Sequence, residues 1–80
     1  MPKLRVLSAK EIITLLEKHG FVLVSQKGSH AKLQRETSGM RQTLTVPTHE
    51  ELDRGTAAAI YRQASRFITE TELREVFYTE

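Results

Sequence analysis

The residues that most directly suggest chemistry are the histidines, which occur at positions 19, 30 and 49. His30 directly follows Lys27-Gly28-Ser29, and Lys32 lies two residues beyond it. Imidazole exchanges a proton near neutral pH, and the two lysines place positive charge beside it. Cleavage of an RNA strand needs a base for the 2′-hydroxyl proton, an acid for the leaving oxygen and cations for the phosphate. His30 also fits a surface histidine of a hairpin, which is the commoner situation for a single histidine.

The other candidate residues near these histidines are weaker indicators of a particular chemistry. Gly28 lets a backbone or a phosphate come close, and Ser29 offers a hydroxyl and an amide. A hydrolase pair of Ser29 and His30 is disfavoured, because adjacent strand residues point to opposite faces. His19 is explained by a helix end, and His49 fits an exposed loop, although it would lie close to His30 if His30 is beside Pro47. The histidine spacing matches no zinc template, so we expect neither a metal nor a cofactor.

Length and composition limit the class of protein. The chain has 80 residues, which predicts one small domain and excludes a Rossmann cofactor domain or a barrel. The absence of cysteine excludes disulfides and cysteine-based zinc clusters. Its apolar runs are far shorter than the ~20 residues of a membrane span, and its first residues lack the apolar segment of a signal peptide. We therefore expect a cytoplasmic protein with no membrane partner.

The net charge of +2 is unevenly distributed along the chain. Residues 1–49 carry a net charge of +5, whereas residues 50–80 carry a net charge of −3. A basic front half favours contact with a polyanion, and an acidic back half favours a second kind of surface. An ordinary solvated surface is the simpler interpretation of the same counts.

A helix over about 9–19 must precede the histidine motif. Ser8 and Glu11 form a capping box at its start, and Gly20 follows as a left-handed C-cap. The apolar face of this helix consists of Ile12, Ile13, Leu15 and Leu16.

Three strands are predicted next, over 21–26, 30–36 and 41–46, and Pro47 ends the third. A hairpin closed by Thr37 and Met40 gives a register that pairs apolar residues on one face, Ala31 with Val46 and Leu33 with Leu44. The opposite face is polar and would look to solvent or ligand, with His30 beside Pro47, Lys32 opposite Thr45 and Gln34 opposite Thr43.

The first strand is apolar on both faces at its start, so the pattern allows two registers. A three-residue loop or a bulge at Gly28 would bury Phe21 and Leu23, whereas a two-residue loop would bury Val22 and Val24. Because Phe21 has the larger area to hide, we favour the arrangement with Phe21 inside.

The back half is predicted to be helical. Thr48 with Glu51 forms a capping box for a short turn anchored by Leu52, Gly55 breaks that turn, and Thr56 caps a helix over 57–66. Thr69 with Glu72 forms a third box, which opens a C-terminal helix containing Leu73, Val76 and Phe77. The order α-β-β-β-α with a small helix appended predicts an α+β fold, with helices on one face of a three-stranded antiparallel sheet.

From Ser8 to Ala64 the chain resembles the HicA toxins, also called YcfA-like, of bacterial and archaeal toxin–antitoxin pairs. Gly-Ser-His alone is a common tripeptide, but here it belongs to an ordered set of matching segments, which lie at 7–13 (LSAKEII), 16–21 (LEKHGF), 26–30 (QKGSH), 45–47 (TVP), 51–56 (ELDRGT) and 60–64 (IYRQA).

The resemblance implies a fold like the double-stranded-RNA-binding domain, cleavage of mRNA that arrests translation, and a HicB-family antitoxin that covers the site. His30 falls on the family's catalytic histidine, and we expect RNA contacts from Lys27, Gly28, Ser29 and Lys32. The implied unit is a single toxin domain over 1–80, with a core at about 8–66 and a helical tail at about 69–80.

One departure from the family pattern affects the tail. The family commonly has Gln-Ala-Gly at the end of its second helix, whereas this chain has Gln63-Ala64-Ser65. Loss of that glycine would let the second helix run longer, which leaves the position of the acidic tail open.

Three functions are consistent with these sequence features. The first is a metal-independent endoribonuclease with His30 as general acid–base. The second is a non-catalytic module that reads A-form RNA by shape and 2′-hydroxyl contacts. The third is a protein-interaction domain whose basic half docks on an acidic partner. The His30→Ala variant separates the first two, and salt dependence of RNA binding separates the third.

Overall fold

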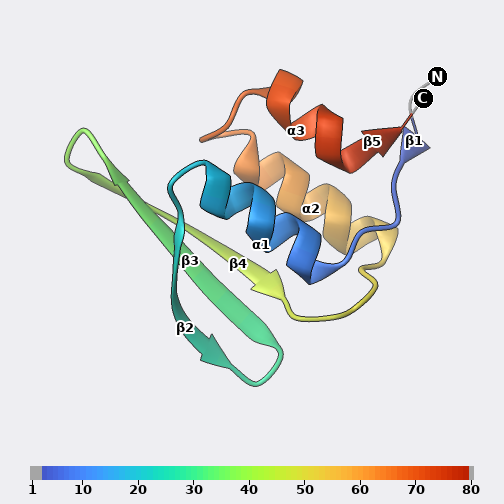
Figure 1. Cartoon of the computed structure of the whole chain (residues 1–80), viewed down its shortest axis with the longest axis horizontal. Helices are drawn as coiled ribbons and strands as arrows, with labels where there is room; N and C mark the ends of the chain where they lie inside the picture. Colours follow the sequence, from blue (N-terminus) through green and yellow to red (C-terminus); the bar gives the residue numbers. More distant parts are fainter. Residues whose placement is uncertain (1–2, 80) are drawn as a thin grey trace.

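A computed structural model of the protein describes the backbone of residues 3–79 (Figure 1). The elements in chain order are β1 (Lys3–Leu4), α1 (Ala9–Lys18), β2 (Val22–Lys27), β3 (His30–Thr37), β4 (Met40–Pro47), α2 (Arg54–Ala64), α3 (Glu70–Phe77) and β5 (Tyr78–Thr79). This order confirms the predicted α+β fold with its α-β-β-β-α core and appended helix. The two short terminal strands, β1 and β5, were not predicted.

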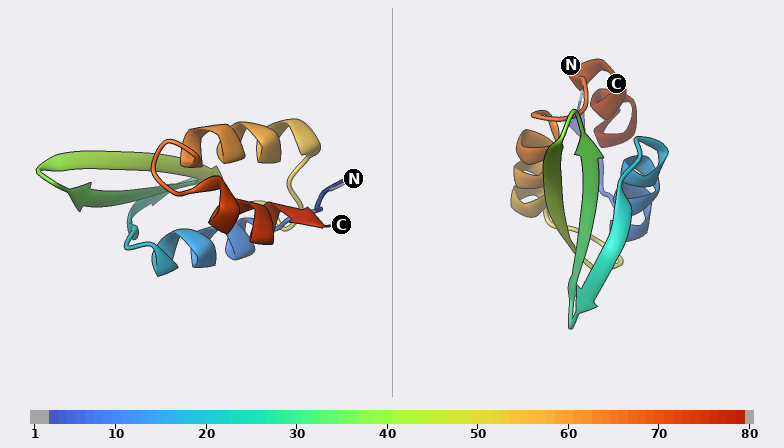
Figure 2. Two further views of the ribbon diagram at one scale, coloured as in Figure 1. Left: turned by 90° about the horizontal axis from the view of Figure 1, so that it is seen from above. Right: turned by 90° about the vertical axis from the view of Figure 1, so that its left-hand side faces the viewer.

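The molecule is layered, with the sheet on one side and the helices on the other. Strands β2, β3 and β4 form an antiparallel sheet in that order, and α1 and α2 both contact β4. Helix α3 packs on α1 and α2, and the tip of the β3–β4 hairpin projects past the helices (Figure 2). Strands β1 and β5 pair antiparallel, which brings the two ends of the described chain together. The other face of the main sheet is therefore left free of helices.

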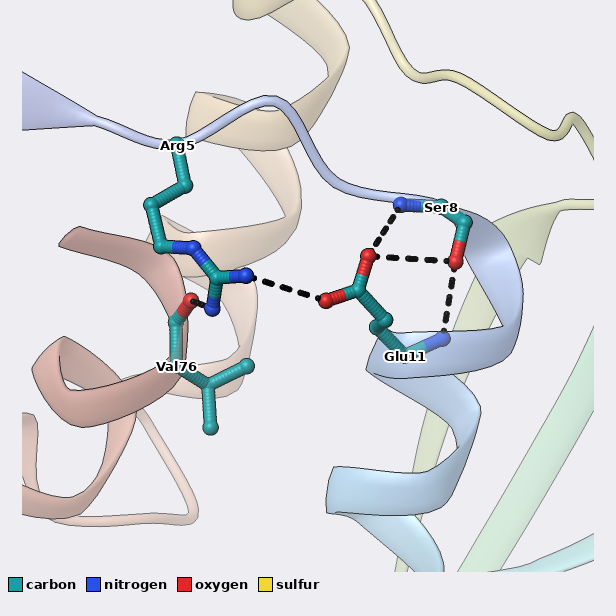
Figure 3. A network of polar contacts seen from close by, with 4 residues as sticks. All are labelled: Arg5, Ser8, Glu11 and Val76. Carbon is teal, nitrogen blue, oxygen red and sulfur yellow. Dashed lines mark hydrogen bonds and ion pairs between the residues drawn. The ribbon is translucent and has the colours of Figure 1, made fainter. Parts of the chain in front are cut away.

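Helix α1 begins with the predicted capping box (Figure 3). The Glu11 backbone N–H donates to Ser8 Oγ at 3.2 Å, and the Ser8 backbone N–H donates to Glu11 Oε1 at 3.1 Å. The Arg5 guanidinium adds a link, because it donates to Glu11 Oε2 at 3.2 Å and to the Val76 carbonyl of α3 at 2.9 Å. The start of α1 is thus fixed both to its own cap and to α3.

The β3–β4 hairpin has the predicted register. Thr37 pairs with Met40, and the apolar pairs Leu33–Leu44 and Ala31–Val46 follow along the ladder. All four of these apolar side chains are buried. They join one hydrophobic core with the apolar faces of the helices, which includes Ile12, Leu16, Phe21, Leu52, Ile60, Ile68, Leu73 and Phe77.

The first strand confirms only part of its prediction. Phe21 is buried, as expected, but Leu23 is 43% exposed, so the expectation that it would be buried is wrong. The connection to β3 is a two-residue turn between Lys27 and His30, and the register shifts between Leu23 and Ser25 instead of at Gly28. An irregularity in mid-strand, which the sequence does not signal, changes which side chains face the core.

Arg35 ties the sheet to the helical layer. Its guanidinium donates to Gln42 Oε1 at 2.8 Å, to the His19 carbonyl at 2.8 Å and to the Phe67 carbonyl at 3.0 Å. The same group lies over the Phe21 ring, 4.8 Å from its centroid. One side chain therefore joins β3, β4, the end of α1 and the loop before α3.

The α2 helix begins earlier than predicted. It starts at Arg54 after the N-cap residue Asp53, so Gly55 lies inside the helix and Thr56 is not its cap. Residues 50 and 51 form a bend instead of a capped turn, and the Leu52 backbone N–H donates to the Leu7 carbonyl at 2.8 Å. That bridge and the burial of the Leu52 side chain hold the chain extended where a capped turn was predicted.

The ends of the last two helices also differ in detail from the prediction. Helix α2 ends at Ala64, so the missing glycine does not lengthen it. Thr69 is the N-cap of α3, as predicted, but its side chain makes no capping bond. Glu72 Oε2 instead lies 2.7 Å from Nε2 of His19, and this contact joins α3 to the end of α1.

Candidate active site

The closing pair of the β2–β3 hairpin carries the histidine motif. Lys27 pairs with His30, and Gly28 and Ser29 form the turn between them. Gly28 has a φ of +54°, a left-handed conformation that favours glycine, and an added Cβ would meet nothing within 4 Å. The local sequence therefore makes a tight turn that presents a lysine and a histidine side by side.

Lys32 shares the sheet face of Lys27 and His30. Side chains alternate along a strand, so His30 and Lys32 point the same way, and a directly paired residue such as Lys27 shares that face. This outer face is opposite the buried Ala31 and Leu33. The side chains of Lys27, His30 and Lys32 are all exposed. The remaining polar members of the face are Ser25, Gln34, Glu36, Arg41, Thr43 and Thr45.

Backbone contacts fix the turn to the rest of the molecule. His30 pairs with Pro47, as predicted, and the Thr48 backbone N–H donates to the Ser29 carbonyl at 2.7 Å. One residue later the His49 carbonyl accepts from the Ala9 backbone N–H at 3.0 Å. The loop after β4 thereby connects the site turn to the start of α1, so the position of His30 depends on the whole fold.

The chain segment that contains the turn is positively charged. Residues 18–35 contain no Asp or Glu, and they contribute Lys18, Lys27, Lys32 and Arg35. The carboxylate on the outer face is Glu36, which pairs with Arg41 at the far end of β3, 3.9 Å from its guanidinium. An anion that approaches Lys27 and Lys32 thus meets no nearby carboxylate from this part of the sequence.

The other two histidines have different surroundings. His19 is the C-cap of α1, where Nδ1 lies 3.0 Å from the Leu15 carbonyl and Nε2 contacts Glu72, so its role is structural. The exposed His49 lines a hollow of about 510 Å³ beside α1. Its carbonyl is used by Ala9, which places it with the helix start instead of on the outer sheet face.

The predicted site residues lie at the end of β2, in the turn and at the start of β3, and one further member of the face was not predicted. Ser25 pairs with Lys32 and joins the outer face, yet its side was undecided while the register of the first strand was open. The two-residue Gly28-Ser29 turn was the available signal, because it fixes Ser25 and Lys27 on the same face as His30.

The described residues contain neither a membrane-spanning helix nor a cluster of metal ligands. None of the helices is long and apolar enough to cross a membrane. Within residues 3–79, no three His, Asp or Glu side chains gather in a way that could hold a metal ion.

Comparison with known proteins identifies the family. A search of curated proteins finds no match to the chain. The family described as HicA toxin of bacterial toxin–antitoxin matches residues 9–65, which include α1, the three-stranded sheet, the histidine turn and α2. The matched segment spans well over half of the 80 residues and leaves α3 outside it. The chain therefore belongs to the HicA family and is a toxin of a toxin–antitoxin system.

Proposed function

We propose that this toxin is a metal-independent endoribonuclease that cleaves mRNA, with His30 as its general acid–base. The observation that carries this proposal is the common face of Lys27, His30 and Lys32, which is exposed and free of helices. It brings a proton-exchanging side chain and two cations together on a surface that a polymer can reach. A deep pocket is not required for this chemistry, because the substrate supplies its own nucleophile.

The reaction proceeds by attack of the 2′-oxygen on the adjacent phosphorus. His30 accepts the 2′-hydroxyl proton as the P–O bond to the 2′-oxygen forms, and the P–O5′ bond breaks. The leaving 5′-oxygen takes a proton from His30 or from water, which gives a 2′,3′-cyclic phosphate and a 5′-hydroxyl. Lys27 and Lys32 stabilise the charge that develops on the phosphoryl oxygens.

The turn residues shape the approach of the RNA. Gly28 leaves open space where a side chain would stand, so the sugar–phosphate backbone can come close to the turn. Ser29 is exposed and offers its hydroxyl to a phosphate oxygen, while its carbonyl is already used by Thr48. RNA binding is thus assigned to Lys27, Gly28, Ser29 and Lys32.

The partner that silences this activity is proposed to be a HicB-like antitoxin that covers the His30 face. Toxin–antitoxin membership shows that an antitoxin exists, and the positive charge of the face favours an acidic one. Because its substrate is mRNA, the toxin acts in the cytoplasm.

The test is incubation of purified toxin with mRNA in the presence of a chelator. Wild-type protein should cleave the RNA, and His30→Ala should slow cleavage by about 10²–10⁴-fold while RNA affinity stays nearly unchanged. The matched control is His49→Ala, which removes a second exposed histidine and should cleave normally. A need for divalent metal would contradict the mechanism, and RNA binding without cleavage would favour the non-catalytic RNA-binding module.

A further inference from the structure

The start of β2 exposes three consecutive aliphatic side chains. Val22 is 62% exposed, Leu23 is 43% exposed and Val24 is 49% exposed. The strand lies at the edge of the sheet, next to β3 alone. We call these three residues the β2 ridge. Val22 pairs with Gln34 and lies on the outer face, whereas Leu23 pairs with the buried Leu33 and points to the core side. Neighbouring exposed apolar side chains at a sheet edge mark an interaction surface more often than scattered single residues do.

The fold does not require the β2 ridge. Phe21 is the buried residue of this segment, and its ring packs near that of Phe67, with 6.2 Å between the ring centroids. The register shift between Leu23 and Ser25 leaves Val24 without a partner in β3. Polar or charged residues here would protect an exposed edge from unwanted pairing, yet the chain has two valines and a leucine. The hydrophobic core therefore gives the apolar character of these three residues no role.

The charge near the β2 ridge decides which partner fits. Residues 18–35 carry four cationic side chains and no carboxylate, and Lys27 ends the same strand. A second copy of this chain would bring like charges together at the edge, which is unfavourable. RNA would gain from the lysines but little from aliphatic side chains, because bases stack on aromatic rings. The surface fits a protein with apolar side chains flanked by carboxylates.

We propose that the β2 ridge is the docking site of the antitoxin. An acidic segment of the antitoxin packs its apolar side chains on Val22 and Val24, and its carboxylates reach Lys27. This inference rests on the proposed function, in which the antitoxin silences the toxin at the His30 face.

The position of the ridge explains how docking there inhibits the toxin. Lys27 lies three positions after Val24, a distance of about 10 Å along an extended strand. Lys27 is paired with His30, so a segment anchored on the ridge and directed along β2 covers the site within a few residues. The apolar contacts slow dissociation of the antitoxin, and its carboxylates compete directly with RNA phosphates for Lys27.

The experiment measures affinity between the purified toxin and the protein encoded by the antitoxin gene adjacent to its own, by isothermal titration calorimetry. The variant V22T/V24T keeps β-branched side chains but replaces one methyl group of each valine with a hydroxyl, and we expect antitoxin binding to weaken about tenfold or more. The matched control is V6T, because Val6 is similarly exposed, at 66%, but lies before α1. It should bind as the wild type does.

A second measurement uses the unchanged toxin. Hydrogen exchange of the backbone amides of residues 22–27 should slow when the antitoxin is added. Wild-type affinity of V22T/V24T for the antitoxin, or unchanged exchange at these amides, overturns the inference.

RNA cleavage is scored separately in the absence of antitoxin, and V22T/V24T should cleave normally. A toxin that binds the antitoxin through the ridge but cuts no RNA would remove the nuclease proposal and leave the docking site intact.

Discussion

Lys27 faces His30 across the closing pair of the β2–β3 hairpin, with only Gly28 and Ser29 between them in the chain. Directly opposed residues of an antiparallel pair have Cβ atoms about 4.5–5.5 Å apart on one face. A phosphate held by this lysine therefore lies within reach of the imidazole. Substrate contact and proton transfer are combined in one turn, which allows a small domain to carry the proposed chemistry.

Replacement of the site lysines should weaken RNA binding and its salt dependence. Lys27→Ala and Lys32→Ala each remove one cation from the outer face, so each should lower RNA affinity several-fold at low salt. For single-stranded RNA, the slope of log affinity against log salt should fall by about 0.7 for each lost phosphate contact. Filter binding over a salt series measures both quantities.

The matched control for the lysines is Lys10→Ala. Lys10 is equally exposed but lies on α1, on the helical side of the sheet. Its removal should leave the salt slope unchanged. Equal losses from all three variants would mean that RNA responds to overall charge and does not use the outer face.

Two turn glycines allow a comparison of stability with activity. Gly28 and Gly39 both have positive φ values, +54° and +76°, and both have open space around an added Cβ. Gly28→Ala and Gly39→Ala should each lower the free energy of unfolding by about 1 kcal/mol, measured by urea denaturation. Gly28→Ala should also reduce RNA cleavage, because its methyl group would stand where the phosphate approaches. Similar cleavage rates for the two variants would contradict the role of Gly28.

Much of this fold could be predicted from local patterns. The capping box at Ser8 and Glu11 fixed the start of α1, and the Thr37–Met40 hairpin fixed the register of two strands, because one face had to be apolar. The same register predicted that His30 and Lys32 share the polar face. Local chemistry was sufficient wherever a turn or a cap determined the geometry.

The remaining features depend on contacts between distant segments. The irregularity at Val24 interrupts the pairing of β2 with β3, and the apolar residues of this strand had allowed two registers. Asp53 is the N-cap of α2. The prediction took Gly55 as a helix breaker and therefore placed the cap at Thr56. Glu72 was predicted to form a capping box with Thr69, but its side chain contacts His19, which is 53 residues away in the chain. The packing of α3 on α1 determines which contact Glu72 makes, and this packing cannot be predicted from the local sequence.

Arg35 should contribute more to stability than any surface cation. Its three hydrogen bonds and its position over Phe21 join four segments. Arg35→Ala should lower the free energy of unfolding by about 2–3 kcal/mol. Arg35→Lys should recover little of it, because an ammonium group cannot reproduce the planar donor geometry. Thermal or urea unfolding followed by circular dichroism measures the change.

The control for Arg35 is Arg41→Ala. Arg41 is exposed, and its contact with Glu36 is a 3.9 Å surface pair, so its loss should change stability by less than about 0.5 kcal/mol. A similar small effect at Arg35 would show that the guanidinium contacts exchange freely with water.

Tyr61 should make the stability of the toxin fall at alkaline pH. Burial raises the pKa of the Tyr61 phenol above its ordinary value of 10.0, and its hydrogen bond to Glu70, 3.0 Å long, raises the pKa further. The folded state thus holds this proton more tightly than the unfolded chain does. The resulting stability is present below pH 10 and is lost as pH rises from there through the folded pKa. Urea denaturation at pH 8 to 11 should show the decline.

The Tyr61→Phe variant isolates this effect. It lacks the hydroxyl that donates to Glu70, so at pH 8 it should be less stable than the wild type by about 0.5 kcal/mol, as expected for an exposed hydrogen bond. Above pH 10 the difference should shrink, because the wild type alone loses the contribution of this phenol. Glu70→Gln removes the carboxylate charge but keeps an acceptor, so its alkaline decline should be weaker than that of the wild type. Parallel declines of wild type and Tyr61→Phe would show that Tyr61 does not control alkaline stability.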